Sequence, residues 1–444
     1  MTLKRINRVA IGKINTPGGA SAWDQVEKYL AADMTGGYVD LETASASTME
    51  HTRPQIAITG QRGDGETPAS VSGNKDASPS LAFYIRGLDL PGGAAAGVNA
   101  STATPQYDML LEQSAGGTTR NIDGEVIIAG STEWVLQFGA GGAVGFGIGD
   151  VVGWVNLSGK MECLPVVNVN VGLEQVTVAG DSAGFPTGGF SSIPAIGDII
   201  YGMRTYPIDQ TAGERAHITV HAQLADTGLE RFFQGCLGSV SFADADGLLM
   251  ATWAAQAQTW TAQQNAAGSS AFAAVYIPPN LGPVSTRGAR VLICAESSWG
   301  VDSTGAFTAT DVAVATAITG GFDMAVDVQP RAAATGVNGR QGFVAVQSGC
   351  TSDVRVYHDG TTAALLAGGS QTFGDGAALS FMDNQVISLL LQFGDQPGAT
   401  VVLEIPAYQA NATIGEEGGL ATIDLSGKGF RPDYGTATAR IHLL

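Results

Sequence analysis

The sequence is poor in charged residues, and above all in positive ones. Only 14% of its 444 residues are charged, whereas globular proteins average about 25%. Lysine and arginine together number 22 and aspartate and glutamate 41, so the formal net charge is −19. Proteins that hold nucleic acid by neutralising phosphates need a basic surface, and this class is therefore excluded. So few charges cover the surface of a large monomer poorly, which favours a homo-oligomer that hides much of each subunit.

Cysteine, histidine and long apolar runs are scarce as well. The four cysteines lie far apart without a C-x-x-C pair, which argues against a zinc site and against a disulfide framework. No apolar run approaches the roughly 20 residues that a membrane helix needs. The basic residues of segment 1–8 are not followed by an apolar segment, so we expect no secretory signal. We therefore expect a protein that is synthesised in a cytoplasm and has no contact with a membrane.

Three local patterns resemble catalytic or metal-binding motifs but lack what the chemistry requires. Residues 180–184 fit the nucleophile elbow G-x-S-x-G around Ser182, yet segment 185–189 contains proline and two glycines and cannot form the helix that must follow. His217 and His221 stand about 13 Å apart on a strand, too far to share one metal ion. Residues 244–247 begin like a calcium loop but lack its later ligands, and we interpret them as a hairpin turn. We expect no catalytic activity, cofactor or metal.

Most of the sequence has the character of β-strands. Residues 55–59 and 81–86 alternate apolar with polar or small side chains, and the polar, glycine-rich segment between them predicts a hairpin with a long projecting loop. One helix is predicted to begin at Pro105 and to end at Gly116. A weaker capping pattern predicts a second helix over residues 23–34.

The chain divides into three expected units. Residues 121–207 contain short strands with regular Gly-Asp turns, which predict a small closed β-barrel. Strand patterns on both sides make this barrel an insertion into a first domain that comprises residues 1–120 and 208–265. The remaining residues, 266–444, form the second domain. Both domains are rich in strands and similarly punctuated, but the sequence leaves open whether they are degenerate copies of one unit.

Several blocks of sequence resemble the major tail tube proteins of long-tailed bacteriophages. They are residues 104–112 (TPQYDMLLE), 233–242 (FQGCLGSVSF), 392–398 (QFGDQPG), 404–409 (EIPAYQ) and 416–425 (EEGGLATIDL). With the early strand pair, these blocks touch most of the chain outside residues 121–207. They reflect an order of strands rather than catalytic signatures, and the inserted barrel departs from the smallest family members.

The resemblance implies a mainly β fold with two tail-tube β-sandwich domains, whose strands join those of neighbouring subunits in a shared β-barrel around a lumen. It implies the duplicated-domain type, which forms a homotrimer with pseudo-sixfold symmetry and stacks into the tail tube of the virion. DNA passes through such a tube without specific binding, and tail terminator, tape-measure and distal tail proteins are the implied partners. An acidic chain suits this role because carboxylates on the wall repel phosphates. A β-rich capsid decoration or head–tail connector protein, and a secreted hydrolase that uses Ser182, stay as alternatives.

Two sets of residues are candidates for this role. Acids that interrupt strand-like stretches are candidates for the lumen wall, with an outer solvated face as the alternative for each: Glu42, Glu404 and Asp424. The loop 60–76 is a candidate contact between stacked rings through its charged residues: Arg62, Asp64, Glu66 and Lys75.

Overall fold

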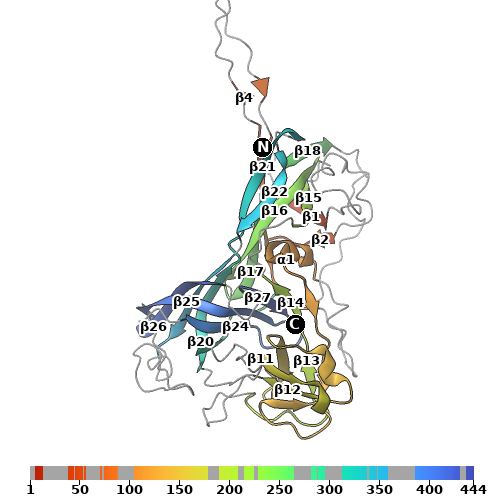
Figure 1. Ribbon diagram of the computed structural model, residues 1–444. Helices are drawn as coiled ribbons and strands as arrows, with labels where there is room; N and C mark the ends of the chain where they lie inside the picture. Colours follow the sequence, from red (N-terminus) through yellow and green to blue (C-terminus); the bar gives the residue numbers. More distant parts are fainter. Residues whose placement is uncertain are drawn as a thin grey trace, which may run out of the picture.

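The protein is mainly β, and the part of the chain that the structure describes contains one α-helix (Figure 1). The structure is a computed structural model. It describes residues 6–13, 39–44, 46–53, 55–56, 71–72, 75–88, 105–178, 190–208, 215–224, 229–264, 282–287, 289–295, 313–337, 340–347, 349–358, 386–430 and 437–444. No helix within these ranges has the length and apolar character needed to cross a membrane.

The strands of the largest sheet form two groups, which we call the first and second repeats. The first repeat contains β1 (Ile6–Lys13), β2 (Val39–Leu41), β3 (Thr48–Thr52), β6 (Asp76–Tyr84), β15 (Ile218–Leu224), β16 (Leu229–Ala245), β17 (Leu248–Gln256) and β18 (Thr259–Gln264). The second repeat contains β19 (Arg290–Ala295), β20 (Ala313–Asp323), β23 (Cys350–Tyr357), β24 (Val386–Phe393), β25 (Val401–Glu417), β26 (Leu420–Gly429) and β27 (Arg440–Leu443).

Each antiparallel pairing of the first repeat has a counterpart in the second. β1 pairs with β2 and β15, as β19 pairs with the beginning of β20 and with β24. β16 and β25 are both 17 residues long. The first part of β16 pairs with β15 and β18, and the first part of β25 pairs with β24 and β27. The remainder of β16 forms a hairpin with β17, and the sheet continues from β17 to β6 and β3. In the same way, the remainder of β25 forms a hairpin with β26, and the sheet continues from β26 to β23 and the end of β20. The duplication that the sequence left open is therefore present in the fold.

Matching two-residue turns close the long hairpin of each repeat. Asp246-Gly247 joins β16 to β17, and Gly418-Gly419 joins β25 to β26, with φ angles of 56°, 87°, 58° and 84°. Positive φ at both central residues matches the twist of the flanking strands. The hairpin turn predicted for residues 244–247 is confirmed, and Asp244 Oδ1 accepts a hydrogen bond of 3.0 Å from Gly247 N.

The two repeats are joined edge to edge by their strands, and we call this contact the junction. Ser241 and Phe242 of β16 pair with Asp323 and Phe322 of β20. The result is one antiparallel sheet of eight segments in the order β3–β6–β17–β16–β20–β23–β26–β25, strongly curled in Figure 1. Side chains from both repeats share one apolar core, in which the rings of Phe242 and Phe322 lie 6.0 Å apart.

The single α-helix of the described ranges, α1 (Asp108–Ala115), packs against β16 of the first repeat. It begins three residues later than predicted, because Pro105 lies in a preceding turn whose carbonyl accepts from Asp108 N at 3.0 Å. Its end is as predicted, with Gly116 at φ 75° in the left-handed region that favours glycine. The second predicted helix, residues 23–34, lies outside the described residues.

The inserted segment folds as a small barrel with its own core. Its strands are β8 (Glu125–Val126), β9 (Val135–Gln137), β10 (Val151–Val155), β11 (Met161–Asn170), β12 (Gln175–Val178) and β13 (Ile199–Tyr201), with short 3₁₀ helices at Gly142–Gly145 and Val171–Leu173. The sheet order is β8–β13–β10–β11–β12–β9, and a bridge between Ile127 and Phe138 joins its two ends. The adjacent strands β7 (Arg120–Asn121) and β14 (Arg204–Pro207) pair with each other, and β14 pairs with β27 of the larger sheet.

The barrel covers the second repeat on the face opposite the shared core. Leu292, Leu390 and Val402 belong to the barrel core, whereas their neighbours Val291 and Leu391 belong to the shared core. Successive side chains of a strand point to opposite faces, so both faces of this part of the sheet are buried. This explains why the runs Val291-Leu292 in β19, Leu389–Leu391 in β24 and Val401–Leu403 in β25 are continuously apolar instead of alternating.

The early hairpin differs in detail from its prediction. Residues 81–84 form the end of β6 and pair with β17, whereas residues 76–80 of β6 pair with β3; neither part pairs with residues 55–59. Of that predicted strand only β4 (Gln55–Ile56) is described, paired with β5 (Val71–Ser72). The sequence TMEHT of β3 escaped notice because one face is exposed and the other only half-buried. The corresponding hairpin of the second repeat consists of β21 (Asp327–Val337) and β22 (Arg340–Gln347).

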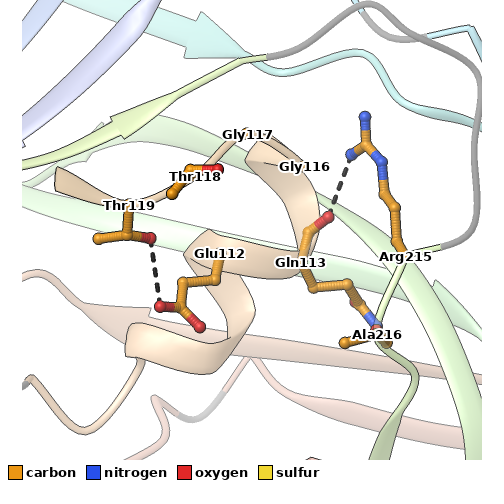
Figure 2. A pocket seen from close by; sticks show the side chains of 8 residues that line it. All are labelled: Glu112, Gln113, Gly116, Gly117, Thr118, Thr119, Arg215 and Ala216. Carbon is orange, nitrogen blue, oxygen red and sulfur yellow. Dashed lines mark hydrogen bonds between the residues drawn. The ribbon is translucent and has the colours of Figure 1, made fainter. Parts of the chain in front are cut away.

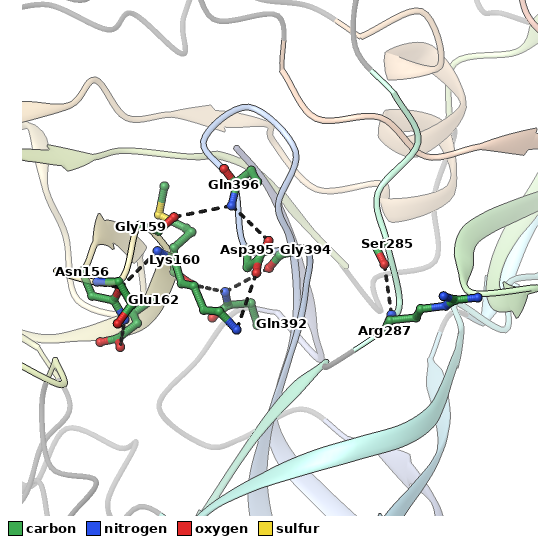
Figure 3. A network of polar contacts seen from close by, with 12 residues as sticks. Asn156, Gly159, Lys160, Glu162, Ser285, Arg287, Gln392, Gly394, Asp395 and Gln396 are labelled. Carbon is green, nitrogen blue, oxygen red and sulfur yellow. Dashed lines mark hydrogen bonds and ion pairs between the residues drawn. The ribbon is translucent and has the colours of Figure 1, made fainter.

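The side chain of Gln392 in β24 forms hydrogen bonds that join the barrel to the second repeat (Figure 3). Its side-chain oxygen accepts from Cys163 N at 3.0 Å, and its amide nitrogen donates to Met161 O at 2.7 Å. We expect Gln392→Leu to destabilise the chain by about 2–4 kcal/mol, because two buried backbone groups lose their partner. Urea unfolding measures this change, and hydrogen exchange of residues 161–165 should accelerate.

The matched control for this substitution is Gln396→Leu. Gln396 lies on the next loop, and its exposed amide makes a 3.4 Å contact with Gly159 O. A loss of stability of similar size in both variants would show that Gln392 has no special role in attaching the barrel.

Candidate assembly surface

The eight-segment sheet has one apolar face and one polar face. In β23, the exposed Thr351, Asp353 and Tyr357 alternate with the buried Val354 and Val356, which belong to the shared core. By the same alternation, six acids and two basic residues of this sheet lie on the polar face: Glu50, Asp76, Asp323, Asp353, Glu417, Asp424, Arg355 and Lys428. The formal charge of this face is therefore 2 − 6 = −4 for one chain.

Asp424 lies on this polar face in an ion-paired group. Arg355 Nε donates to Asp424 Oδ1 at 2.7 Å and its terminal nitrogen donates to Oδ2 at 2.9 Å, while Glu417 accepts from the same guanidinium at 3.0 Å. The hydrogen bond from Arg355 lowers the pKa of the Asp424 carboxyl, which stays ionised at neutral pH. The position agrees with a solvent-facing acid, and its place in a lumen stays a prediction.

Glu404 is buried, and the expectation that it faces a lumen is wrong. Its side chain has no exposed surface and contacts Arg440 Nη1 at 3.0 Å and His442 Nε2 at 3.1 Å. The His442 ring also contacts Thr205 Oγ1 of β14 at 2.9 Å. Glu404 points to the same face as Val402, toward the inserted barrel rather than toward the polar face. A side chain enclosed within one chain cannot line an open passage.

Opposing effects act on the Glu404 carboxyl. Burial raises its pKa, but the Arg440 charge and the His442 hydrogen bond outweigh burial and hold the pKa at about 2. A neighbouring acid behaves in the opposite way: burial raises the pKa of Asp150 to about 6, although Arg120 lies 2.9 Å away. These groups form a polar layer between the second repeat and the barrel.

The other predicted site residues lie elsewhere. Glu42 follows β2 and pairs with Arg86 at 2.9 Å, with 43% of its side chain exposed. Lys75 donates to the backbone oxygen of Trp260 in β18 at 3.1 Å and lies 5.1 Å above its ring. Three further loop residues lie outside the described residues: Arg62, Asp64 and Glu66. The structure therefore does not bring Glu42, Glu404 and Asp424 together.

The residues considered for enzyme chemistry have structural surroundings or lie outside the described ranges. His221 is buried, contacts Glu230 at 3.0 Å and stacks on Phe232. His217 is also buried, with its Nε2 3.5 Å from Phe343 N. Within the described ranges, no group of three or more candidate ligands could hold a metal ion. Ser182 lies outside those ranges.

A cavity of about 300 Å³ lies at the end of α1, and several of the residues that line it cap the helix (Figure 2). Arg215 donates to the carbonyls of Gln113 and Ser114, and Thr119 donates to Glu112 at 3.1 Å. A cation at the carbonyl end of a helix offsets its dipole and its unpaired acceptors. These polar groups are thereby used to terminate the helix.

Comparison with known proteins finds no family model and no curated protein that matches this chain. The internal duplication is therefore the comparison that bears on function. On the outer strands it points to the residues equivalent to those of the junction, which the sequence did not indicate: Met49 and Glu50 on β3, and Thr413 and Ile414 on β25. In the sequence, the only indication of this edge was weak: Ala410, Ala412 and Ile414 alternate with polar or small residues in the part of β25 that becomes polar.

The buried Glu404 group leads to a pH-dependent prediction. Glu404→Gln should destabilise the chain by about 3 kcal/mol at pH 7, because Arg440 loses its buried counter-charge. The folded pKa of about 2 lies below the ordinary value of 4.5, so the stabilisation is complete above pH 4.5 and disappears as the pH falls towards 2. Urea unfolding of both proteins should therefore differ strongly at pH 7 and little at pH 2.5, and a constant difference contradicts this assignment.

Proposed function

We propose that this protein is a structural subunit of a hollow tube that conducts DNA, as the major tail tube proteins of long-tailed bacteriophages do. The junction carries the proposal. Two copies of one unit, within a single chain, already form a continuous antiparallel sheet by pairing β16 with β20. Further copies of the chain extend this sheet in the same way, since its two outer strands, β3 and the end of β25, have described ladder partners on one side only.

A ring of three chains has a wall wide enough for a passage. Each chain supplies eight segments, so three chains supply 8 × 3 = 24. With about 4.8 Å between neighbouring strands, 24 upright strands give a circumference of about 115 Å and a backbone diameter of about 37 Å. Barrels of 16–18 strands already enclose an aqueous channel. The closed wall also removes the exposed strand edges that promote uncontrolled aggregation.

The polar face supplies the lining in this proposal. Its formal charge of −4 in one chain becomes −12 in a ring of three, and stacked rings repeat it along the passage. Carboxylates repel the phosphates of DNA and, unlike lysine or arginine, do not displace the counterions condensed on DNA, so the duplex is enclosed without being held. The inserted barrel packs on β19, β24 and the beginning of β25, whose other face borders the shared core, and the proposal puts it on the outside of the tube.

Electron microscopy of the purified protein and of the virions that contain it tests this function. Hollow tubes of stacked rings are the expected result. A shell-bound protein, or a single ring at a capsid vertex, contradicts the proposal and favours the capsid decoration or head–tail connector alternative.

The acidic lining yields a separate prediction. Asp353→Lys changes the charge of each ring by 2 × 3 = +6 on the polar face, where Asp353 is exposed. Tubes of this variant should cosediment with short DNA duplexes at about 50 mM salt and release them near 200 mM, because binding by phosphate neutralisation depends steeply on salt. Unsubstituted tubes should not bind.

Asp123→Lys is the matched control, since Asp123 is exposed beside the inserted barrel. Equal DNA binding by the two variants would show that the polar face does not line the passage.

A further inference from the structure

Equivalent strand edges of the two repeats have different surroundings: the edge of β16 is buried at the junction, whereas the edge of β25 is the outer edge of the eight-segment sheet. At the junction, Phe242 of β16 is 2% exposed because it meets Phe322 of β20. Ile414 stands at the corresponding place of β25 and is 72% exposed. An apolar side chain on an open strand edge is unfavourable for an isolated chain and typical of an edge that acquires a partner.

The duplication fixes which residues correspond. The hairpin turns begin at Ala245 and Glu417, and the returning strands at Leu248 and Leu420, so the shift between repeats is 417 − 245 = 420 − 248 = 172. Ser241 and Phe242 therefore correspond to 241 + 172 = 413 and 242 + 172 = 414, which are Thr413 and Ile414.

The other side of the junction is matched through the next strands. Leu81 of β6 pairs with Trp253, and Val354 of β23 pairs with Leu425, where 253 + 172 = 425. β6 and β23 thus differ by 354 − 81 = 273. Pro79 and Ser352 are then equivalent, and their partners are Met49 and Phe322. One residue further on, Glu50 corresponds to Asp323.

We infer that copies of this chain join head to tail by pairing β25 of one copy with β3 of the next, with Thr413 opposite Glu50 and Ile414 opposite Met49. This inference rests on the proposed function and specifies the partner and the register of its ring contact. Met49 is half-buried and packs against the shared core, so Ile414 of the next copy extends that core across the boundary. A contact between two different edges forms a ring when its rotation closes.

The second hairpin strengthens the same contact. β21 and β22 extend from the junction strand β20 and lie along β16 of the first repeat (Figure 1). Phe343 of β22 is fully buried there. β4 and β5 are the equivalent hairpin of the first repeat, and β4 projects away from the rest of its own chain in Figure 1. The correspondence places this hairpin beside β25 of the neighbouring copy.

The register can be tested with a disulfide. Met324 N donates to Val240 O at 3.1 Å, so Ser241 and Asp323, one residue along, form a non-hydrogen-bonded pair. Such pairs have Cα atoms about 4.5 Å apart, within the range that a disulfide spans. Thr413 and Glu50 occupy the equivalent positions. Glu50→Cys combined with Thr413→Cys should therefore link chains covalently after mild oxidation.

The expected result is a ladder on a non-reducing gel that stops at the ring size, three chains. The matched control combines Thr48→Cys with Thr413→Cys, which is out of register by two residues and should give several-fold less product. The native Cys163, Cys236 and Cys350 are buried, and the unsubstituted protein measures any background. Equal yields from the two pairs, in samples where microscopy shows rings, overturn the register and leave the proposed function standing. If the unsubstituted protein forms no rings, and the variant with Glu50→Cys and Thr413→Cys forms neither rings nor links, both proposals fail.

A second variant does not depend on disulfide chemistry. Ile414→Asp alters a side chain that is exposed in a single chain, so circular dichroism should show unchanged folding while ring formation is lost. Thr132→Asp, on an exposed loop of the inserted barrel, is the control and should still form rings. Normal rings from Ile414→Asp overturn the inference.

Discussion

The pairing of β16 with β20 holds the two repeats together. It converts two similar units into one curled sheet and lets Phe242 and Phe322 fill a common core. A strand edge has unsatisfied donors and acceptors along its whole length, and pairing is the simplest way to satisfy them. The chain satisfies one such edge internally and presents the equivalent edges at its two ends. Its low charge content follows naturally if those ends are covered in the assembled state.

Among the described residues, the core of the inserted barrel includes side chains of the second repeat and none of the first, and the two repeats differ at this contact. In the second repeat, Leu390 and Val402 meet the barrel core, and Gln392 and Glu404 supply the polar contacts at its border. In the first repeat, the corresponding strands carry the buried pair of His221 and Glu230. Buried polar groups need specific partners, so they fix the register of neighbouring strands at the expense of tolerance to substitution.

Much of the fold could be read from the sequence, because turns and alternation are local signals. The helix end at Gly116, the turn at Asp246-Gly247 and the barrel strands with their Gly-Asp turns were predictable in this way. The duplication was not, since the two repeats share pairings without sharing residue types. Glu404 was assigned to the wrong face because its counter-charges, Arg440 and His442, become neighbours only through the pairing of β25 with β27. β3 was overlooked because a half-buried edge strand has little apolar pattern.

A cryo-electron microscopy map of one ring, at a resolution that separates strands, would show whether neighbouring chains are joined through their strands. We expect threefold symmetry, an uninterrupted sheet across every chain boundary and one inserted barrel per chain on the outer surface. The strand spacing between β25 and β3 of the next chain should equal that between β16 and β20 within a chain. A ring whose chains touch only through side chains, with the outer edges of β3 and β25 both unpaired, would rule out strand pairing between chains.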